Sequence, residues 1–171
     1  MNPEERREYL LNLLKNSSLP LTGTELGEKC NVSRQVIVQD IALLRVKGAN
    51  ILATPQGYIY MNPTPVGLSQ RTLACQHTRD DIEDELETIV GLGGKVIDVI
   101  VEHPVYGEIK GMLMLSSQDD VKRFMHSLQT TGAAPLSYLT KGVHLHTIEV
   151  ESDRQFEEIK KQLKIKGYLV E

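Results

Sequence analysis

Residues 25–37 read ELGEKCNVSRQVI, and their spacing decides the fold of the first third of the chain. Gly27 is small enough to let two helices cross closely. Asn31 follows four residues later, at a sharp turn, and asparagine tolerates the left-handed conformation that such a turn can need. Ser33 can then cap the next helix by accepting a hydrogen bond from a free N–H group. The stretch predicts two helices joined by a tight turn, with Val32 packed between them.

The flanking residues complete a small domain around this turn. Apolar residues at helical spacing predict a helix over residues 3–16 and one further helix on each side of the turn. Gly48 ends the third helix, as glycine commonly does just past a helix. Residues 51–60 then read as two short strands joined by a turn. We therefore expect residues 1–62 to form a winged helix-turn-helix domain.

The helix after the turn carries the residues that would read DNA. Arginine and glutamine can form paired hydrogen bonds with guanine and adenine edges, and valine can contact a thymine methyl group. The candidates are the capping serine and four outward-facing residues, namely Ser33, Arg34, Gln35, Val38 and Gln39. An ordinary three-helix domain or a protein-contact module is the alternative. We expect a double-stranded DNA operator as the partner.

Charge and hydropathy narrow the class of protein without deciding it. Residues 1–62 carry seven Lys/Arg and six Asp/Glu, while residues 63–171 carry twelve and seventeen. The first segment is thus nearly neutral, and electrostatics neither proves nor excludes binding to nucleic acid. No apolar run approaches the roughly 20 residues that span a bilayer, and the first residues are charged where a signal peptide is apolar. We expect a cytoplasmic protein with two reduced cysteines, Cys30 and Cys75, that serve packing.

A second domain follows a proline-rich boundary. Residues 61–67 hold two prolines and a glycine, so we assign a linker to residues 63–70 and a domain to residues 71–171. The pattern beyond the linker reads strand, helix, strand, strand, helix, strand, helix. This order predicts an α+β chain whose second domain is a ferredoxin-like βαββαβ fold with an extra C-terminal helix. In such a sheet the first and last strands are antiparallel neighbours.

Histidines continue the apolar faces of the predicted strands. Strand alternation places His144 and His146 on the same face as Ile148, and His77 on the same face as Cys75. The alternation also groups four residues of the strand near residues 95–103, namely Ile97, Val99, Val101 and His103. Glu85 lies in the core-facing stripe of the first helix of this domain. Three imidazoles and one carboxylate suit a divalent transition metal, so the predicted ligands are His77, Glu85, His144 and His146. The alternative is a set of satisfied core histidines.

Longer stretches resemble known families. Residues 25–60, ELGEKCNVSRQVIVQDIALLRVKGANILATPQGYIY, are similar to the winged domain of the biotin-operon repressor class, a resemblance that covers about residues 5–60. A set of segments over about residues 70–171 resembles the three-histidine (3H) domain. These segments are HTRDDIEDEL (77–86), GGKVIDV (93–99), VEHPVYG (101–107), PLS (135–137) and GVHLHT (142–147). The combination resembles the nicotinate-responsive repressors of NAD biosynthesis and niacin uptake genes.

The resemblance implies a DNA-binding homodimer with nicotinic acid as co-repressor. It also implies one nickel, zinc or iron ion held by the same four residues, His77, Glu85, His144 and His146. Arg79, His103 and Tyr106 are candidates for effector contacts. Two alternatives stay open, a metal-dependent hydrolase with a DNA-targeting domain and a repressor with a structural metal and another effector. The sequence contains no nucleophile elbow, phosphate loop or His-Glu-x-x-His helix, so we expect no enzyme.

Overall fold

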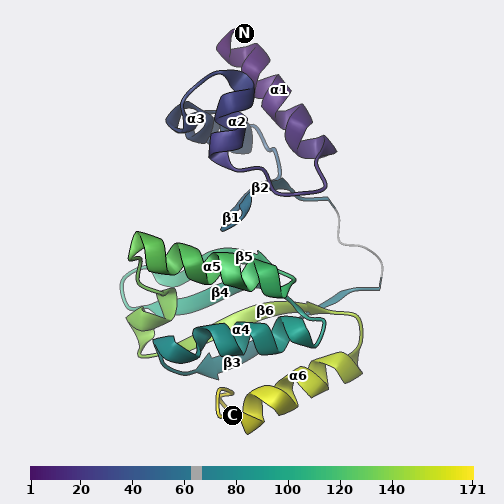
Figure 1. The fold of residues 1–171 in the computed structure, drawn as a ribbon, viewed down its shortest axis with the longest axis vertical. Coiled ribbons are helices and arrows are strands. Elements are labelled where there is room, and N and C mark those ends of the chain that lie inside the picture. Colours follow the sequence, from purple (N-terminus) through teal and green to yellow (C-terminus); the bar gives the residue numbers. More distant parts are fainter. Residues whose placement is uncertain (63–66) are drawn as a thin grey trace. The chain divides into compact units, whose positions relative to one another are not determined.

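The structure, a computed structural model, describes residues 1–62 and 67–171 (Figure 1). The chain divides into two compact units, Met1–Pro63 and Thr64–Glu171, and each is described by itself. The first half of the linker predicted at residues 63–70, residues 63–66, lies outside the described residues. Its last part is a strand instead, because backbone pairing begins at Ser69. Within the described ranges, no helix has the length and apolar content needed to cross a membrane.

The first unit contains three helices and a hairpin, as predicted. The helices are α1 (Pro3–Asn16), α2 (Gly23–Cys30) and α3 (Arg34–Val46). Each begins at a side chain that accepts hydrogen bonds from free helix amides, namely Asn2, Thr22 and Ser33. One apolar cluster joins all three helices to the first strand of the hairpin, and it consists of Leu10, Leu14, Leu26, Cys30, Ile37, Ile41, Leu44 and Ile51. The helix-turn-helix therefore has a core of its own.

The turn between α2 and α3 has the predicted geometry. Asn31 adopts the left-handed conformation with φ 54°, and the Ser33 hydroxyl accepts the Val36 amide at 3.4 Å. Gly27 packs directly against the turn, because a Cβ at this position would lie 2.7 Å from the carbonyl oxygen of Val32. The absence of a side chain at residue 27 therefore allows the two helices to cross closely.

The hairpin is the predicted wing. Strands β1 (Ile51–Thr54) and β2 (Gly57–Tyr60) pair antiparallel, with Thr54 opposite Gly57. Tyr58 also exchanges two backbone hydrogen bonds with Leu21, at 3.0 and 2.8 Å. These bonds attach the wing to the segment that leads into α2, so the wing and the helix-turn-helix form one body.

The second unit has the predicted βαββαβα order. Its strands are β3 (Ser69–Gln76), β4 (Lys95–His103), β5 (Gly107–Leu115) and β6 (Val143–Val150). Its helices are α4 (Ile82–Gly91), α5 (Gln118–Thr131) and α6 (Asp153–Ile165), with short 3-10 turns η1 (Arg79–Asp81) and η2 (Leu136–Thr140). The α+β class and the order of elements are confirmed, and the first and last strands are antiparallel neighbours as expected.

The strand order is a variant of the split βαβ arrangement. The sheet runs β3-β6-β4-β5, so the strand between β3 and β4 is the last one, β6. In the usual ferredoxin arrangement the inserted strand comes from the central hairpin instead. Here the outer edge of β3 is partly covered by the C-terminal tail, through hydrogen bonds from Gln76 to Tyr168 and from Val170 to Ala74. β6 pairs with β3 on one side and with β4 on the other, so its side chains lie in the middle of the sheet.

Three helices cover one face of this sheet, with α4 between α5 and α6 (Figure 1). The core beneath them includes Leu73, Leu86, Ile89, Val96, Leu115, Val121, Ile148, Ile159 and Leu163. The alternation predicted for β4 is wrong at one position, since Val96 joins this core and Ile97 does not. The physical reason is a bulge, because β4 has one residue more than β6 between the pairs Val96–Ile148 and Ile100–Leu145, and the extra residue moves the following side chains to the opposite face.

Gly27→Ala is expected to lower the free energy of unfolding of the first unit by about 1–3 kcal/mol, because the new methyl group would overlap the Val32 carbonyl. Hydrogen exchange of the amides in residues 1–62 measures this loss. Gly23→Ala is the matched control in the same helix, since its methyl group would meet the flexible Arg34 side chain at 3.2 Å. Equal exchange rates in the two variants would contradict the close crossing.

Candidate metal and effector site

Four polar side chains meet beneath α4, inside the second unit. Glu85 projects from α4, His144 and His146 from β6, and His77 from the segment that follows β3. The Glu85 carboxylate lies at the centre, with Nε2 of His77 at 2.5 Å, of His144 at 3.0 Å and of His146 at 3.3 Å. All four side chains are 1–3% exposed. The structure thus brings together the four residues predicted as metal ligands.

The backbone sets the orientation of each imidazole. Nδ1 of His77 contacts the Thr78 carbonyl at 2.8 Å, Nδ1 of His144 contacts the Gly142 carbonyl at 2.8 Å, and Nδ1 of His146 contacts the Asp98 carbonyl at 2.7 Å. A carbonyl oxygen can only accept, so each Nδ1 carries a proton and donates it. In the neutral ring, Nε2 then presents a lone pair toward Glu85. Metal-bound histidines typically donate their other ring N–H to carbonyl or carboxylate oxygens in this way.

The donor set fits a divalent transition metal. Nε2 of His146 is buried and has no hydrogen-bond partner, although Glu85 lies nearby. Three lone pairs turned toward an anion are unfavourable unless a cation or protons lie between them. Imidazole nitrogen and carboxylate oxygen are the ligands of nickel, zinc and ferrous iron. The residues present could therefore hold one such ion.

Without a metal, protons have to balance the buried carboxylate. Burial by itself raises the pKa of Glu85, but the facing imidazoles of His146, His144 and His77 outweigh burial and hold this pKa well below its usual value. Burial lowers the pKa of His77 and His146, and their contacts with Glu85 outweigh it and raise both pKa values. In the metal-free cluster the ionised Glu85 carboxylate therefore favours protonation of His77 and His146.

Gly142 allows β6 to start beside His77. Its φ is +90°, and a Cβ here would overlap the His77 carbonyl oxygen at 2.3 Å. The Gly142 carbonyl also accepts the His144 Nδ1–H. A side chain at residue 142 would therefore separate the two segments that carry these histidines.

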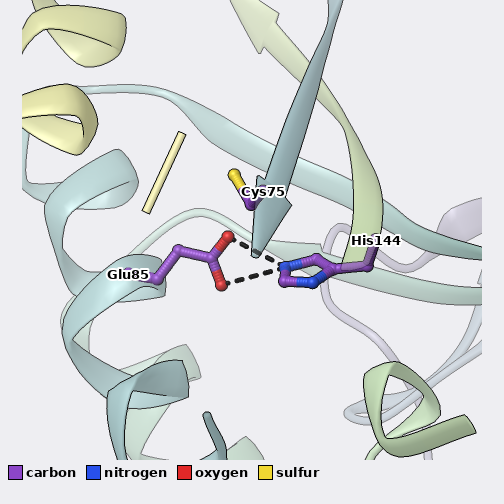
Figure 2. Close-up of side chains that lie close together, drawn as sticks. All are labelled: Cys75, Glu85 and His144. Carbon is purple, nitrogen blue, oxygen red and sulfur yellow. Dashed lines mark hydrogen bonds and ion pairs between the residues drawn. The ribbon is translucent and has the colours of Figure 1, made fainter. Parts of the chain in front are cut away.

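Sequence reasoning missed three residues around the cluster. Cys75, interpreted as a packing residue, is fully buried, and its sulfur lies with ligand atoms of Glu85 and His144 in one group (Figure 2). Burial and the neighbouring Glu85 raise the pKa of the Cys75 thiol. Asp98 positions His146 through its carbonyl, and the Tyr168 ring packs edge-on against His77. The sequence could have indicated Cys75, because strand alternation places it on the same face as His77. It contains no pattern that predicts the bulge at Asp98 or the position of the C-terminal tail with Tyr168.

The three candidates for effector contacts lie elsewhere in the second unit. Nδ1 of His103 accepts the amides of Val105 and Tyr106, at 3.1 and 3.3 Å, so His103 closes the turn between β4 and β5. Tyr106 is 78% exposed at this turn, and Arg79 is exposed at the start of η1. Among the described residues, no hydrogen bond or ion pair joins any of them to Glu85 or the three histidines. Their role in effector binding stays a prediction.

The candidate DNA-reading residues lie on the first turns of α3. Arg34, Gln35 and Gln39 are exposed, and Val38 is half-buried. Ser33 is also exposed, although its hydroxyl is already used in capping α3. Arg6 and the buried Asp40 form an ion pair at 2.6 Å that joins α1 to α3. The structure therefore presents the predicted side chains on a helix that is anchored from behind.

Comparisons with known proteins cover both units. Residues 6–59 match an HTH domain and residues 70–171 match the 3H domain. The chain is 45% identical over 168 residues to the probable transcription repressor NiaR of Thermotoga maritima, which is 98% of this chain and 95% of that protein. It is 44% identical over 167 residues to the transcription repressor NadR of Bacillus subtilis, which is 96% of this chain and 93% of that protein.

The cluster predicts that the stability of the folded chain depends on pH in opposite directions with and without metal. In chelator, the urea midpoint should fall as pH rises above about 6.5, because the raised pKa values of His77 and His146 make protonation stabilise the folded state, and that contribution is lost on deprotonation. With excess zinc or nickel the midpoint should rise with pH, because metal binds the deprotonated rings.

Replacing a histidine of the cluster tests where this dependence comes from. His77→Asn should weaken both trends, whereas His126→Asn, on the exposed surface of α5, should leave them unchanged. A midpoint that is independent of pH in chelator, or unaffected by either metal, would contradict the electrostatics derived for the cluster.

Proposed function

The chain belongs to the family of transcription repressors that join an HTH domain to a 3H domain, and on this basis we propose that it represses genes of NAD biosynthesis or niacin uptake in response to nicotinic acid. The observation that carries the effector part of the proposal is the buried group of three imidazoles around Glu85. A repressor that only bound DNA would have no need of such a group. The DNA-binding part of the proposal rests on two relatives that are named as transcription repressors and on the exposed side chains at the start of α3.

The proposed centre holds one nickel, zinc or iron ion through His77, Glu85, His144 and His146. When bound, the ion supplies a fixed positive charge to which the carboxylate or ring nitrogen of a small aromatic acid can bind. The protein residues keep the imidazoles oriented by the three Nδ1–H···O=C hydrogen bonds and exclude water by burial. The preference for an aromatic acid over its amide would then rest on charge.

Control of DNA binding requires two copies and two arrangements. We propose a homodimer whose two α3 helices read half-sites separated by one or more helical turns, about 34 Å each. Nicotinic acid can shift the equilibrium only by binding one arrangement more tightly than the other. As a co-repressor it would favour the arrangement that matches the operator.

Arg34→Ala is expected to reduce sequence preference. The test compares a duplex that the wild-type protein selects from a random pool with a scrambled duplex. The variant's affinity for the selected duplex, relative to the scrambled one, should fall roughly 5- to 150-fold, or by about 1–3 kcal/mol, because a bidentate base contact is lost. Arg154→Ala, an exposed arginine of α6, should leave the ratio unchanged. Equal weakening of both duplexes by Arg34→Ala would make this residue a phosphate contact and contradict its assignment to base reading.

Nicotinic acid should bind the metal-loaded protein, and nicotinamide should bind much more weakly. Calorimetric titration of the full chain loaded with zinc or nickel measures both affinities. The double variant His144→Ala/His146→Ala should lose binding, while His126→Ala should keep it. No heat with nicotinic acid, on protein shown to be folded and metal-loaded, would remove this effector and leave the assignment of α3 to DNA untouched.

A further inference from the structure

Cys75 lies beside the cluster of Glu85 and the three histidines. It is directly opposite His144 in the β3–β6 register, and it precedes His77 by two residues on the same face of the chain. Its side chain is completely buried. Figure 2 shows Glu85 and His144 directed toward each other from α4 and β6, with Cys75 of β3 beside the Glu85 carboxylate.

The spacing of these groups matches one metal ion. Ligand atoms of Cys75, Glu85 and His144 lie within 4.8 Å of one another. Donors bound to one zinc ion are each about 2.0–2.3 Å from it, so two of them lie at most roughly 4.6 Å apart. Binding of one ion would draw these donors closer together, because donors at a tetrahedral angle lie nearer to one another than this upper limit.

Two further observations favour a bound ion in place of simple packing. Nε2 of His146 is buried without a hydrogen-bond partner and faces the same carboxylate at 3.3 Å. Backbone pairing also fixes the Cys75 backbone from both sides, through β6 and through an isolated bridge to Leu169, so its side chain starts beside the cluster.

We propose that the Cys75 thiolate is a ligand of the metal, together with the three imidazoles and Glu85. The proposal rests on the metal centre of the proposed function and names the kind of ion that this centre selects. When the metal–sulfur bond forms, the S–H bond breaks and its proton leaves to water. Thiolate is a soft ligand, so the centre favours zinc, cadmium or cobalt over magnesium and manganese.

Cobalt(II) titration of the metal-free full chain tests the sulfur ligand by absorption spectroscopy. Coordination by the imidazoles and Glu85 alone gives weak bands in the visible region. A thiolate adds a strong charge-transfer band in the near-ultraviolet. We expect both in the wild-type protein, and we expect Cys75→Ser to lose the near-ultraviolet band while keeping the visible ones. Cys30→Ser is the matched control, because Cys30 lies in the core of the first unit and should keep both.

The outcomes separate this inference from the metal centre itself. Visible bands without the near-ultraviolet band in the wild-type protein would show a metal bound without sulfur and overturn the role of Cys75 alone. A near-ultraviolet band that survives Cys75→Ser and disappears in Cys30→Ser would also overturn it. No cobalt bands at all would overturn the centre and the thiolate ligand together.

A second measurement needs no variant and applies even if Cys75→Ser does not fold. X-ray absorption at the zinc edge of the zinc-loaded wild-type chain should require one sulfur at about 2.3 Å in addition to nitrogen and oxygen at about 2.0–2.1 Å. A first shell fitted by nitrogen and oxygen alone would overturn the proposal.

Discussion

The negative charge of the buried Glu85 carboxylate has to be compensated inside the protein by positive charge or protons. The arrangement of the second unit around Glu85 follows from this constraint. An unpaired charge in a protein interior costs several kcal/mol, so Glu85 requires cationic or protonated neighbours. Three imidazoles meet this need, at 2.5–3.3 Å from the carboxylate. Each imidazole in turn needs an acceptor for Nδ1–H and finds it in a backbone carbonyl. One charge thereby determines the orientation of three rings and the course of three backbone segments.

Irregular backbone near the cluster serves the same constraint. The bulge of β4 against β6, between Val96 and Ile100, contains Asp98, whose carbonyl contacts His146 and whose carboxylate accepts the Thr147 amide at 2.9 Å, which ties β4 to β6 at this point. Gly142 lets β6 begin against the His77 carbonyl. The position of β6 between β3 and β4 then encloses both of its histidines. Regular strands at the edge of a sheet would leave these imidazoles open to water.

The charge and surface chemistry of the two units match their proposed roles, DNA binding for the first and effector binding for the second. The first is nearly neutral and presents arginine and glutamine side chains from a helix anchored by its own core. The second is acidic and buries its most polar group. A proposed effector in the second unit and DNA at the first could influence each other only through a free energy shared between arrangements of the whole dimer.

The amino-acid sequence by itself determined the order of helices and strands and the shared face of His144 and His146, because helical and strand periodicity are local properties of the chain. Turn chemistry at Gly27, Asn31 and Ser33 was local for the same reason. Only the tertiary structure decided that β6 is an inner strand, that β4 bulges against β6 between Val96 and Ile100, and that Cys75 lies opposite His144. These features depend on pairing between distant segments, where several strand orders bury the same apolar faces. The role of His103 in the turn between β4 and β5 could not be predicted from the sequence either. A histidine that accepts the amides of its neighbours has the same sequence pattern as one that faces a ligand.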